Sequence, residues 1–515
     1  MGSSLVLFAS DTGDNASAGI TAFFALLLVA LIACLALEEK LHAKKSIIAG
    51  IFAIVCLLLG AICGILQFNR VVVGSHELVD IQAIEGDYVD PDDHRQHIEI
   101  HHDEPQDAEL HDDQSVHIGG HRLDMPVYIP GINWGVIAII LGSSLFVDVT
   151  SKSGLFTWIA IKVTKASGGD PLKLLYFYGM MTVVFSAVLN NVTAMIIVGS
   201  LTAVSLEKLN RKEKLLGFLL IEGLLTNVGG LLTLISSVPN IIVGTTANIS
   251  FVQFFLMAAP YVLVASALTM WMGARFFSIA PLKTDEDREA AATLVASFDE
   301  NDGVESWGFF WFGAAMLCLF IVVIATISVL PFGINHLGMG FVALSFAGIM
   351  LVRYKSEVDK FYRTVDWDLL GFFMALFVVI YVMEHAMVLH MVGVGLQQLV
   401  NVEDPTMWHT SVLLTASAAF SSVTDNIPLA AMLASILHDL GASPDSPLWW
   451  SVIFGANLGG NLTPIGSAST LVAVTIMHKH ELHMSFGGFV KVAVPYAFAQ
   501  IVLATLYVLI ISYAF

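Results

Sequence analysis

Four short polar or glycine-rich segments interrupt long apolar runs of this sequence, and they form two matched pairs. One pair is Leu189-Asn190-Asn191-Val192 and Thr424-Asp425-Asn426-Ile427. The other is Asn227-Val228-Gly229-Gly230 and Asn457-Leu458-Gly459-Gly460. Glycine admits unusual backbone angles, and short Asn, Ser and Thr side chains compete for backbone hydrogen bonds. Helices broken at such points free carbonyl oxygens that can coordinate a cation and N–H groups that attract an anion.

Few carboxyl groups lie inside the apolar runs, and each is a candidate for ion or proton binding because ionisable groups are costly in lipid. They are Asp148, Glu222, Glu384 and Asp425. Asp425 stands at one interruption, where it could bind Na⁺ in one state and a proton in another, or instead cap the adjoining half-helix. Glu222 precedes Asn227 by five residues and is the second candidate for proton coupling. Asp148 and Glu384 are expected near helix ends, at the interface.

Other classes of chemistry find little support. No Lys or Arg falls within the four interruptions, which favours a small cation as cargo. The cluster His478-Lys479-His480-Glu481-Leu482-His483 lacks the two-His spacing of a zinc protease helix and is expected in a polar inner loop. We therefore expect no enzyme, no cofactor and no nucleic-acid partner.

The composition requires a membrane protein. Of 515 residues, 56% are hydrophobic and 13% charged, whereas soluble domains carry about a quarter charged residues. Uncharged runs such as 18–37 are long enough to cross a hydrocarbon layer of about 30 Å. The four cysteines all lie in apolar stretches and are expected to be packing residues.

The apolar runs predict about ten spans and two re-entrant hairpins. The hairpins are 171–206 and 409–438, each entering and leaving on one side of the membrane. The predicted spans are 18–37, 46–67, 132–150, 216–246, 252–277, 306–328, 335–352, 367–385, 446–475 and 487–513.

The basic residues predict the orientation of these spans. With the N-terminus outside, 20 of the 23 Lys and Arg residues fall in inner loops, and only Arg70, Arg95 and Arg122 stay outside. If either hairpin crossed the membrane, later loops would change sides and this asymmetry would fall.

The net charge of −20 is concentrated in one loop. Between Glu77 and Asp124 there are fifteen Asp or Glu, two Arg and seven His, without apolar periodicity. This composition is typical of a solvated, disordered connector. Its histidines, including His101 and His102, could bind Zn²⁺ or Ni²⁺ weakly, but their spacing matches no closed tetrahedral site.

The paired segments predict an internal repeat. The offset is 233 residues between Ile132-Asn133-Trp134 and Val365-Asp366-Trp367, 235 between the first pair of interruptions, and 230 between the second. Five crossings separate the first motif from its copy, so the second copy is expected upside down. Inverted repeats of interrupted helices are typical of secondary transporters, whose site lies near the membrane midplane.

We therefore predict an all-α polytopic membrane protein with an inverted-repeat transporter architecture. Residues 1–67 form two scaffold spans and 68–131 an acidic, His-rich external loop. Residues 132–277 form the first repeat core, with hairpin 171–206, broken helix 216–246 and one further span. A cytoplasmic linker at 278–305 and scaffold spans at 306–352 precede the second core at 367–513, with hairpin 409–438 and broken helix 446–475.

At these residues the sequence resembles the ion transporter superfamily, specifically the ArsB/NhaD-like permeases, which also include the melanosomal P protein and citrate-transporter-like domains. The matching stretches are 185–197, 226–244, 421–433 and 455–472. The resemblance implies a dimeric secondary transporter whose hairpin tips meet two discontinuous helices. It implies an ion or substrate site from Asn190, Asn191, Thr193, Gly229, Gly230, Thr233, Ser236, Ser237, Asn240, Thr424, Asp425, Asn426, Gly459, Gly460, Asn461, Thr463, Ser467, Ser469 and Thr470.

The chain departs from this family pattern at two positions. Relatives frequently carry Asp-Asn where this chain has Asn190-Asn191, and many carry Gly-Asp-Pro-Pro-Asn where it has 236–240. Two expected carboxylates are therefore missing. The sequence favours Na⁺/H⁺ antiport in the cell membrane by alternating access, with Na⁺- or H⁺-coupled transport of arsenite or a di- or tricarboxylate as the alternative.

Overall fold

The structure is a computed structural model. It describes residues 17–66, 71–73, 88–89, 97–98, 121–123, 129, 131–301, 303–331, 334–355, 358–424 and 426–513. Among these residues almost all regular structure is helical, and apolar side chains of both halves of the chain form one core.

The first half of the chain begins with two apolar helices and ends with one of 26 residues. Its elements are α1 Ala18–Ala36, α2 Glu38–Leu41, α3 Lys45–Ile62, α4 Trp134–Ser151, α5 Leu155–Ala166, α6 Pro171–Val188, α7 Asn191–Lys208, η2 Lys212–Lys214, α8 Leu215–Gly229, α9 Val238–Thr246 and α10 Phe251–Phe276.

The second half repeats this order after a short linker helix. Its elements are α11 Asp285–Ala296, α12 Trp307–Thr326, η3 Ile327–Val329, η4 Ile334–Leu337, α13 Gly338–Arg353, α14 Val358–Thr364, α15 Trp367–His385, α16 Val388–Gln397, α17 Met407–Ser421, α18 Asn426–Asp439, α19 Pro447–Gly459, α20 Ala468–Lys479 and α21 Phe486–Tyr513.

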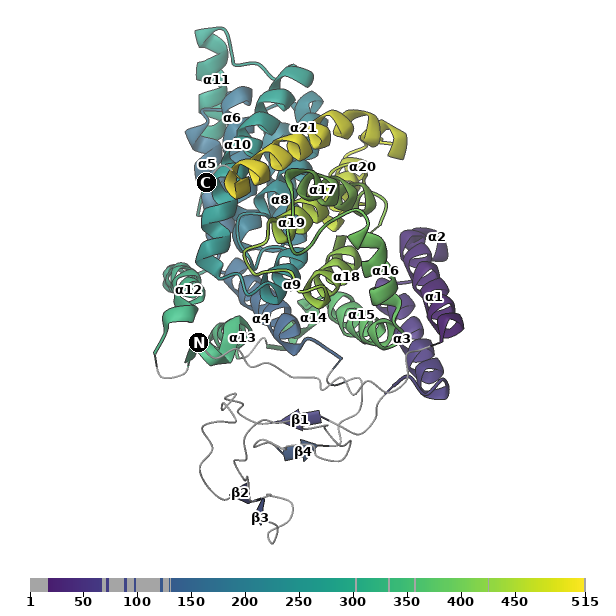
Figure 1. Cartoon of the computed structure of the whole chain (residues 1–515). Coiled ribbons are helices and arrows are strands. Elements are labelled where there is room, and N and C mark those ends of the chain that lie inside the picture. The colour runs from purple at the N-terminus through teal and green to yellow at the C-terminus, as the bar shows by residue number, and fades with distance from the viewer. Residues whose placement is uncertain are drawn as a thin grey trace.

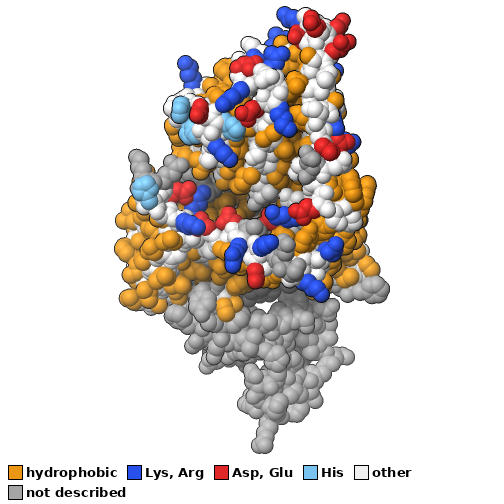
Figure 2. Space-filling model, turned by 180° about the vertical axis from the view of Figure 1, so that it is seen from behind, with side chains coloured by type: hydrophobic (Ala, Val, Ile, Leu, Met, Phe, Trp, Pro, Cys, Tyr) orange, Lys and Arg blue, Asp and Glu red, His pale blue; other side chains and the backbone are white. Residues whose placement is uncertain are grey.

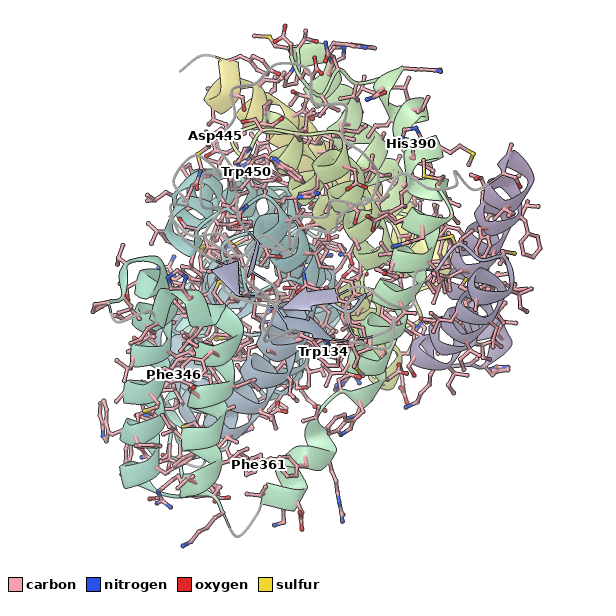
Figure 3. The ribbon with its side chains drawn as sticks, turned by 60° about the horizontal axis from the view of Figure 1, so that its bottom comes forward. Trp134, Phe346, Phe361, His390, Asp445 and Trp450 are labelled. Atoms are coloured by element: carbon pink, nitrogen blue, oxygen red, sulfur yellow. The ribbon has the colours of Figure 1, made fainter. Side chains whose placement is uncertain are left out.

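The first matched motif marks the start of a helix in both halves. The Asn133 side chain accepts a hydrogen bond from the Val136 N–H at 3.1 Å, and the Trp134 indole donates to Ile129 O at 3.1 Å. These are side-chain caps of the kind that begin helices. Trp134 is labelled in Figure 3.

The second copy of the motif makes the same two bonds. The Asp366 side chain accepts from the Leu369 N–H at 2.9 Å, and the Trp367 indole donates to Tyr362 O at 2.9 Å. The 233-residue repeat seen in the sequence is therefore a repeat of helix-start geometry.

Eight described helices are long and apolar enough to cross a membrane: α1, α3, α4, α6, α10, α12, α15 and α21. The sequence predicted about ten spans. The two broken helices miss this criterion because each is divided into pieces of at most fifteen residues, and α13 has sixteen. One arm of the predicted first hairpin, α6, meets it.

Outer helices of each half pack against helices of the other half. In Figure 1, α1 and α3 lie on one flank and α12 and α13 on the opposite flank, with α8, α9 and α17 to α19 between them. Helix α3 packs along α15, and α13 packs along α4. Each flank therefore supports a helix of the other half.

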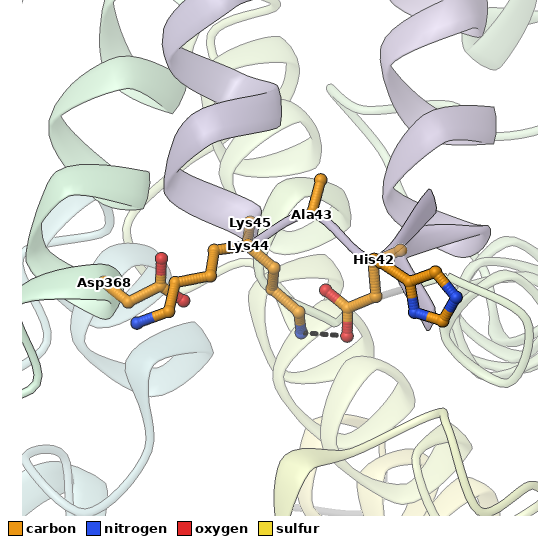
Figure 4. Close-up of a pocket in the computed structure, with 6 residues that line it drawn as sticks. His42, Ala43, Lys44, Lys45 and Asp368 are labelled. Carbon is orange, nitrogen blue, oxygen red and sulfur yellow. Dashed lines mark ion pairs between the residues drawn. The ribbon is translucent and has the colours of Figure 1, made fainter. Parts of the chain in front are cut away.

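A polar contact fixes the start of α3 on α15. The Ser46 hydroxyl and the Ser46 N–H both donate to the Asp368 carboxylate, the latter at 3.3 Å. Beside it, Lys45 and Glu38 form an ion pair at 3.8 Å in a surface pocket also lined by His42 (Figure 4).

Five short α-helices were not predicted from the sequence, and the first of them is α2, which follows α1. Helices α5 and α16 follow α4 and α15 in matching positions, and α11 lies in the stretch expected to be a plain linker. The remaining one, α14, packs against α4. In α11, Thr284 accepts a hydrogen bond from the Asp287 N–H at 3.1 Å, and three acidic residues occupy the first turn, which stabilises a helix N-terminus.

Only small parts of the acidic loop are described. Strand β1 Val71–Val73 pairs antiparallel with β4 His121–Leu123, and β2 Tyr88–Val89 pairs with β3 His97–Ile98. These pairs were not predicted, while His101 and His102 lie outside the described residues. Across the described residues no group of three or more His, Cys, Asp or Glu is placed to hold a metal ion.

Apolar side chains cover much of the outer surface. On α1 and α3, Leu26 and Ile62 are 69% and 80% exposed, and Trp311 on α12 is 66% exposed. Figure 2 shows hydrophobic side chains along the flanks of one face, with charged side chains around a central hollow and towards the top of the view. Such an apolar surface is that of a protein embedded in lipid.

Candidate functional site

Two helical hairpins end in turns beside the broken helices. Between α6 and α7, Leu189 is buried and Asn190 is exposed. The Asn190 side chain accepts a hydrogen bond from the Thr193 N–H at 2.9 Å and so caps α7. In the second hairpin, the Thr424 hydroxyl donates back to Phe420 O at 2.8 Å. Asp425 lies outside the described residues.

The two glycine pairs end helices where the sequence predicted breaks. Helix α8 ends at Gly229 and α19 ends at Gly459. A methyl group on Gly229 would stand 2.7 Å from the Val183 Cα, and one on Gly459 would overlap the backbone of Ala418 in the same way. Glycine is required here because each hairpin packs directly on its broken helix.

Hydroxyl groups form matching hydrogen bonds between each hairpin and the broken helix beside it. Ser186 donates to Thr226 O at 2.6 Å, and its counterpart Ser421 donates to Ala456 O at 2.6 Å. The predicted site residues Thr233 and Thr463 form a second matching pair of hydrogen bonds. They donate to the carbonyl oxygens of Ala187 at 2.5 Å and Ser422 at 2.6 Å.

Three other predicted residues cover carbonyls freed by the breaks. Ser236 and Asn240 both donate to Gly230 O, at 2.5 and 2.7 Å. Thr470 donates to Ser467 O at 2.7 Å. Freed carbonyls in lipid need such partners, so these side chains stabilise the broken backbone in this state of the protein.

The two breaks meet in a reciprocal pair of side-chain hydrogen bonds. Ser237, at the start of α9, donates to the Asn457 side chain on α19 at 2.7 Å. Ser467, at the start of α20, donates to the Asn227 side chain on α8 at 3.0 Å. The second contact joins the same two positions of the repeat as the first, but the serine and the asparagine come from opposite halves. Both pairs are buried, which makes this the polar centre of the molecule.

Further amides extend this centre. Asn227 donates to the Asn461 side chain at 2.8 Å, and Asn457 donates to the Asn240 side chain at 2.9 Å. Ser469 donates to Asn227 at 3.1 Å, and Asn191 from the first hairpin tip reaches the same oxygen at 3.4 Å.

Two residues of the long helices α21 and α10 extend the network from Asn461, and this extension is not repeated at the matching position of the other half. The Gln500 side chain on α21 accepts from Asn461 at 2.8 Å and donates to Thr269 on α10 at 2.8 Å. The residue 230 positions before Asn461 is Leu231, which has no amide, so this branch has no counterpart in the first half.

A cleft leads to the first hairpin tip. It is lined by Ser143, Asp148, Asn190, Ser236 and Asp366, with apolar side chains between them. These residues come from α4, the hairpin, the first break and the start of α15. The predicted tip residues Asn190 and Thr193 thus line the approach to the centre rather than the centre itself.

Glu222 lies on α8, and its side chain makes no hydrogen bond with the central amides. Its side chain is fully buried, Thr202 donates to Oε1 at 2.6 Å, and Oε2 has no hydrogen-bond partner among the described residues. An ionised carboxylate without a charge partner costs several kcal/mol at such a place, whereas an unpartnered neutral group costs about 1–3 kcal/mol.

Six of the predicted site residues come together at the centre. They are Asn191, Ser237, Asn240, Asn461, Ser467 and Ser469. The sequence motif contained Asn227 and Asn457, but we did not expect them as site residues, and Gln500 was missed altogether. A lone amide in the apolar run 486–513 was the signal for Gln500.

Comparisons with known proteins agree on the kind of molecule. A model of the citrate transporter family matches residues 117–455. The "46 kDa membrane protein" of Mycobacterium leprae is 29% identical over 383 residues, covering 73% of this chain and 86% of that protein. The P protein of Mus musculus is 24% identical, covering 76% of this chain and 55% of that protein.

A solved structure shares the fold. The YdaH transporter of Alcanivorax borkumensis, described as having an unusual topology, matches with a TM-score of 0.53 at 13% sequence identity. The match covers 96% of this chain and 99% of the other. The arrangement of helices seen here is therefore that of a known transporter fold.

Proposed function

Because this chain belongs to the citrate transporter family and is a multi-pass membrane transporter, we propose that it is a secondary active Na⁺/H⁺ antiporter working by alternating access. The observation that carries this proposal is the reciprocal contact of Ser237 with Asn457 and of Ser467 with Asn227. It gathers neutral oxygen atoms from two broken helices in a buried centre.

The chemistry of this centre suits a small cation. Among the described residues, every side chain in the hydrogen-bonded centre is an amide or a hydroxyl, and helices α8 and α19 end there with their carbonyls. Oxygen ligands of this kind bind hard cations, and helix C-termini add negative potential. A Na⁺ ion would replace hydrogen bonds that the oxygens now accept.

The alternative is transport of arsenite or a di- or tricarboxylate coupled to Na⁺ or H⁺, and one observation favours it. Helices α7, α9, α18 and α20 all begin at the hairpin tips and breaks. Helix N-termini attract anions. The family's description as citrate transporters also supports this alternative.

Vesicles containing the reconstituted full-length protein distinguish the two functions. We expect Na⁺ to collapse a preset pH gradient, followed with a pH-sensitive dye, without any organic substrate. Uptake of labelled citrate or arsenite, with no Na⁺-dependent proton flux, would replace antiport by the alternative. If neither Na⁺ nor these anions moves, both proposals fail.

The orientation and assembly are proposed with this function. We place the N-terminus and the loop 68–131 outside and the basic loops inside, because Lys and Arg accumulate on the cytoplasmic side. We expect a homodimer. Mass measurement of the purified protein in lipid nanodiscs tests the dimer, and a single-chain mass contradicts it.

A further inference from the structure

The Glu222 carboxyl group is separate from the central amides and has a hydrogen-bonded surrounding of its own. Thr202 on α7 donates to one carboxyl oxygen, while the other has no partner among the described residues. The corresponding position in the second half is Val452, which is fully buried and apolar. The second half therefore has no carboxyl group at the matching position.

No charge compensates Glu222 in the described structure. Of the ionisable side chains on helices packed against α8, Tyr178 on α6 is fully buried, and its hydroxyl group is hydrogen-bonded to Ser205 and Thr164. No ion pair joins Glu222 to another described side chain. The remaining ionisable residues on the packed helices and on η2 are Lys173, Tyr176, Glu207, Lys208, Lys212, Glu213, Lys214, Tyr261, Arg275, His478, Lys479, Lys491, Tyr496, Tyr507 and Tyr513.

A row of three buried hydroxyl groups runs from α7 to α5, and it starts about one helical turn from Thr202, the hydrogen-bond partner of Glu222. No hydrogen bond joins the Thr202 and Ser205 side chains. The Ser205 hydroxyl is 2.8 Å from the Tyr178 hydroxyl, which is 2.5 Å from the Thr164 hydroxyl on α5. Thr164 is followed by Lys165, which pairs with Glu300 of the linker at the protein surface. Hydroxyl groups both donate and accept, so such a row can relay a proton.

We propose that Glu222 is a proton-binding site distinct from the central Asn and Ser network, and that Ser205, Tyr178 and Thr164 connect it to the α5 surface. Proton binding by Glu222 does not depend on the proposed antiport. Only its use in coupling rests on that function.

Infrared difference spectroscopy of the full-length protein in lipid membranes tests proton binding directly, without a transport assay. At neutral pH we expect a protonated-carboxyl C=O band that Glu222→Gln removes. The control Glu207→Gln, at an exposed position on α7, keeps the band. Identical spectra of wild type and Glu222→Gln would overturn the proposal. If that variant does not fold, Thr202→Val serves instead and is expected to shift the band, while an unchanged band contradicts the assignment.

The route is tested by exchange of the same proton in heavy water. Tyr178→Phe removes the central hydroxyl of the row but keeps the ring. We expect the Glu222 band to persist and its deuterium exchange to slow by about tenfold, the effect of one lost hydrogen bond. Unchanged exchange would show that the proton reaches Glu222 by another path and would overturn this route.

Discussion

At the scale of single residues, Asn227 links four side chains across the centre. Its oxygen accepts from Asn191, Ser467 and Ser469, and its nitrogen donates to Asn461. An amide suits this place because it donates and accepts at once without carrying a charge.

Replacing Asn227 by alanine removes one hydrogen-bond partner from each of these side chains, of which Asn461, Ser467 and Ser469 are buried. We expect Asn227→Ala to lower the free energy of unfolding by about 1–3 kcal/mol and to abolish transport. Thermal unfolding of the purified protein and vesicle assays measure the two effects. Asn301→Ala, in the exposed linker, is the matched control and is expected to change neither.

Asp425 is the residue at which the sequence places a carboxylate beside the second hairpin tip. We expect Asp425→Asn to insert and fold normally but to lose coupled transport, because an amide cannot exchange a proton for Na⁺. Normal pH-dependent exchange by this variant in vesicles contradicts a coupling role for Asp425.

At the scale of elements, the contact between hairpins and broken helices is limited by glycine. A methyl group at Gly229 would stand 2.8 Å from Val183 O and 3.1 Å from the Ser186 Cβ. We expect Gly229→Ala to push the hairpin away and to lower both thermal stability and transport. Gly395→Ala on α16, where no atom lies within 4 Å of the added methyl, is the control. It should leave transport unchanged and stabilise its helix by up to about 1 kcal/mol.

The elements that the sequence predicted are those with long apolar runs or unmistakable interruptions. The glycine pairs allowed the ends of α8 and α19 to be predicted closely, and Asn190-Asn191 did the same for the boundary between α6 and α7, because these residues stop helices by local chemistry. Helices α5 and α16 were missed because each has at most twelve residues beside a longer apolar run. The pairing of Asn227 with Ser467 and of Asn457 with Ser237 could not be predicted, because the two residues of each pair lie in opposite halves, more than 200 positions apart.

At the scale of the whole molecule, separating the two halves would expose the surfaces that each half packs against the other. Helices α3 and α15 pack along each other, as do α13 and α4, and the central hydrogen bonds also cross between halves. A reciprocal exchange of contacts is what two copies related by an axis in the membrane plane would make. The charge pattern predicts opposite directions for the two copies, because Lys and Arg accumulate in inner loops.

Variants with a single introduced cysteine, and with the native cysteines replaced, test on which side of the membrane each hairpin begins and ends. On either side of the first hairpin, Lys173→Cys and Lys212→Cys are both exposed sites and should react with reagent only from the inside. On either side of the second hairpin, Asp404→Cys and Asp445→Cys should react only from the outside (Figure 3 labels Asp445). Two members of one pair labelled from opposite sides would mean that the hairpin crosses the membrane. All four labelled from one side would mean that the copies are parallel, and either result would remove the basis for alternating access between opposed hairpins.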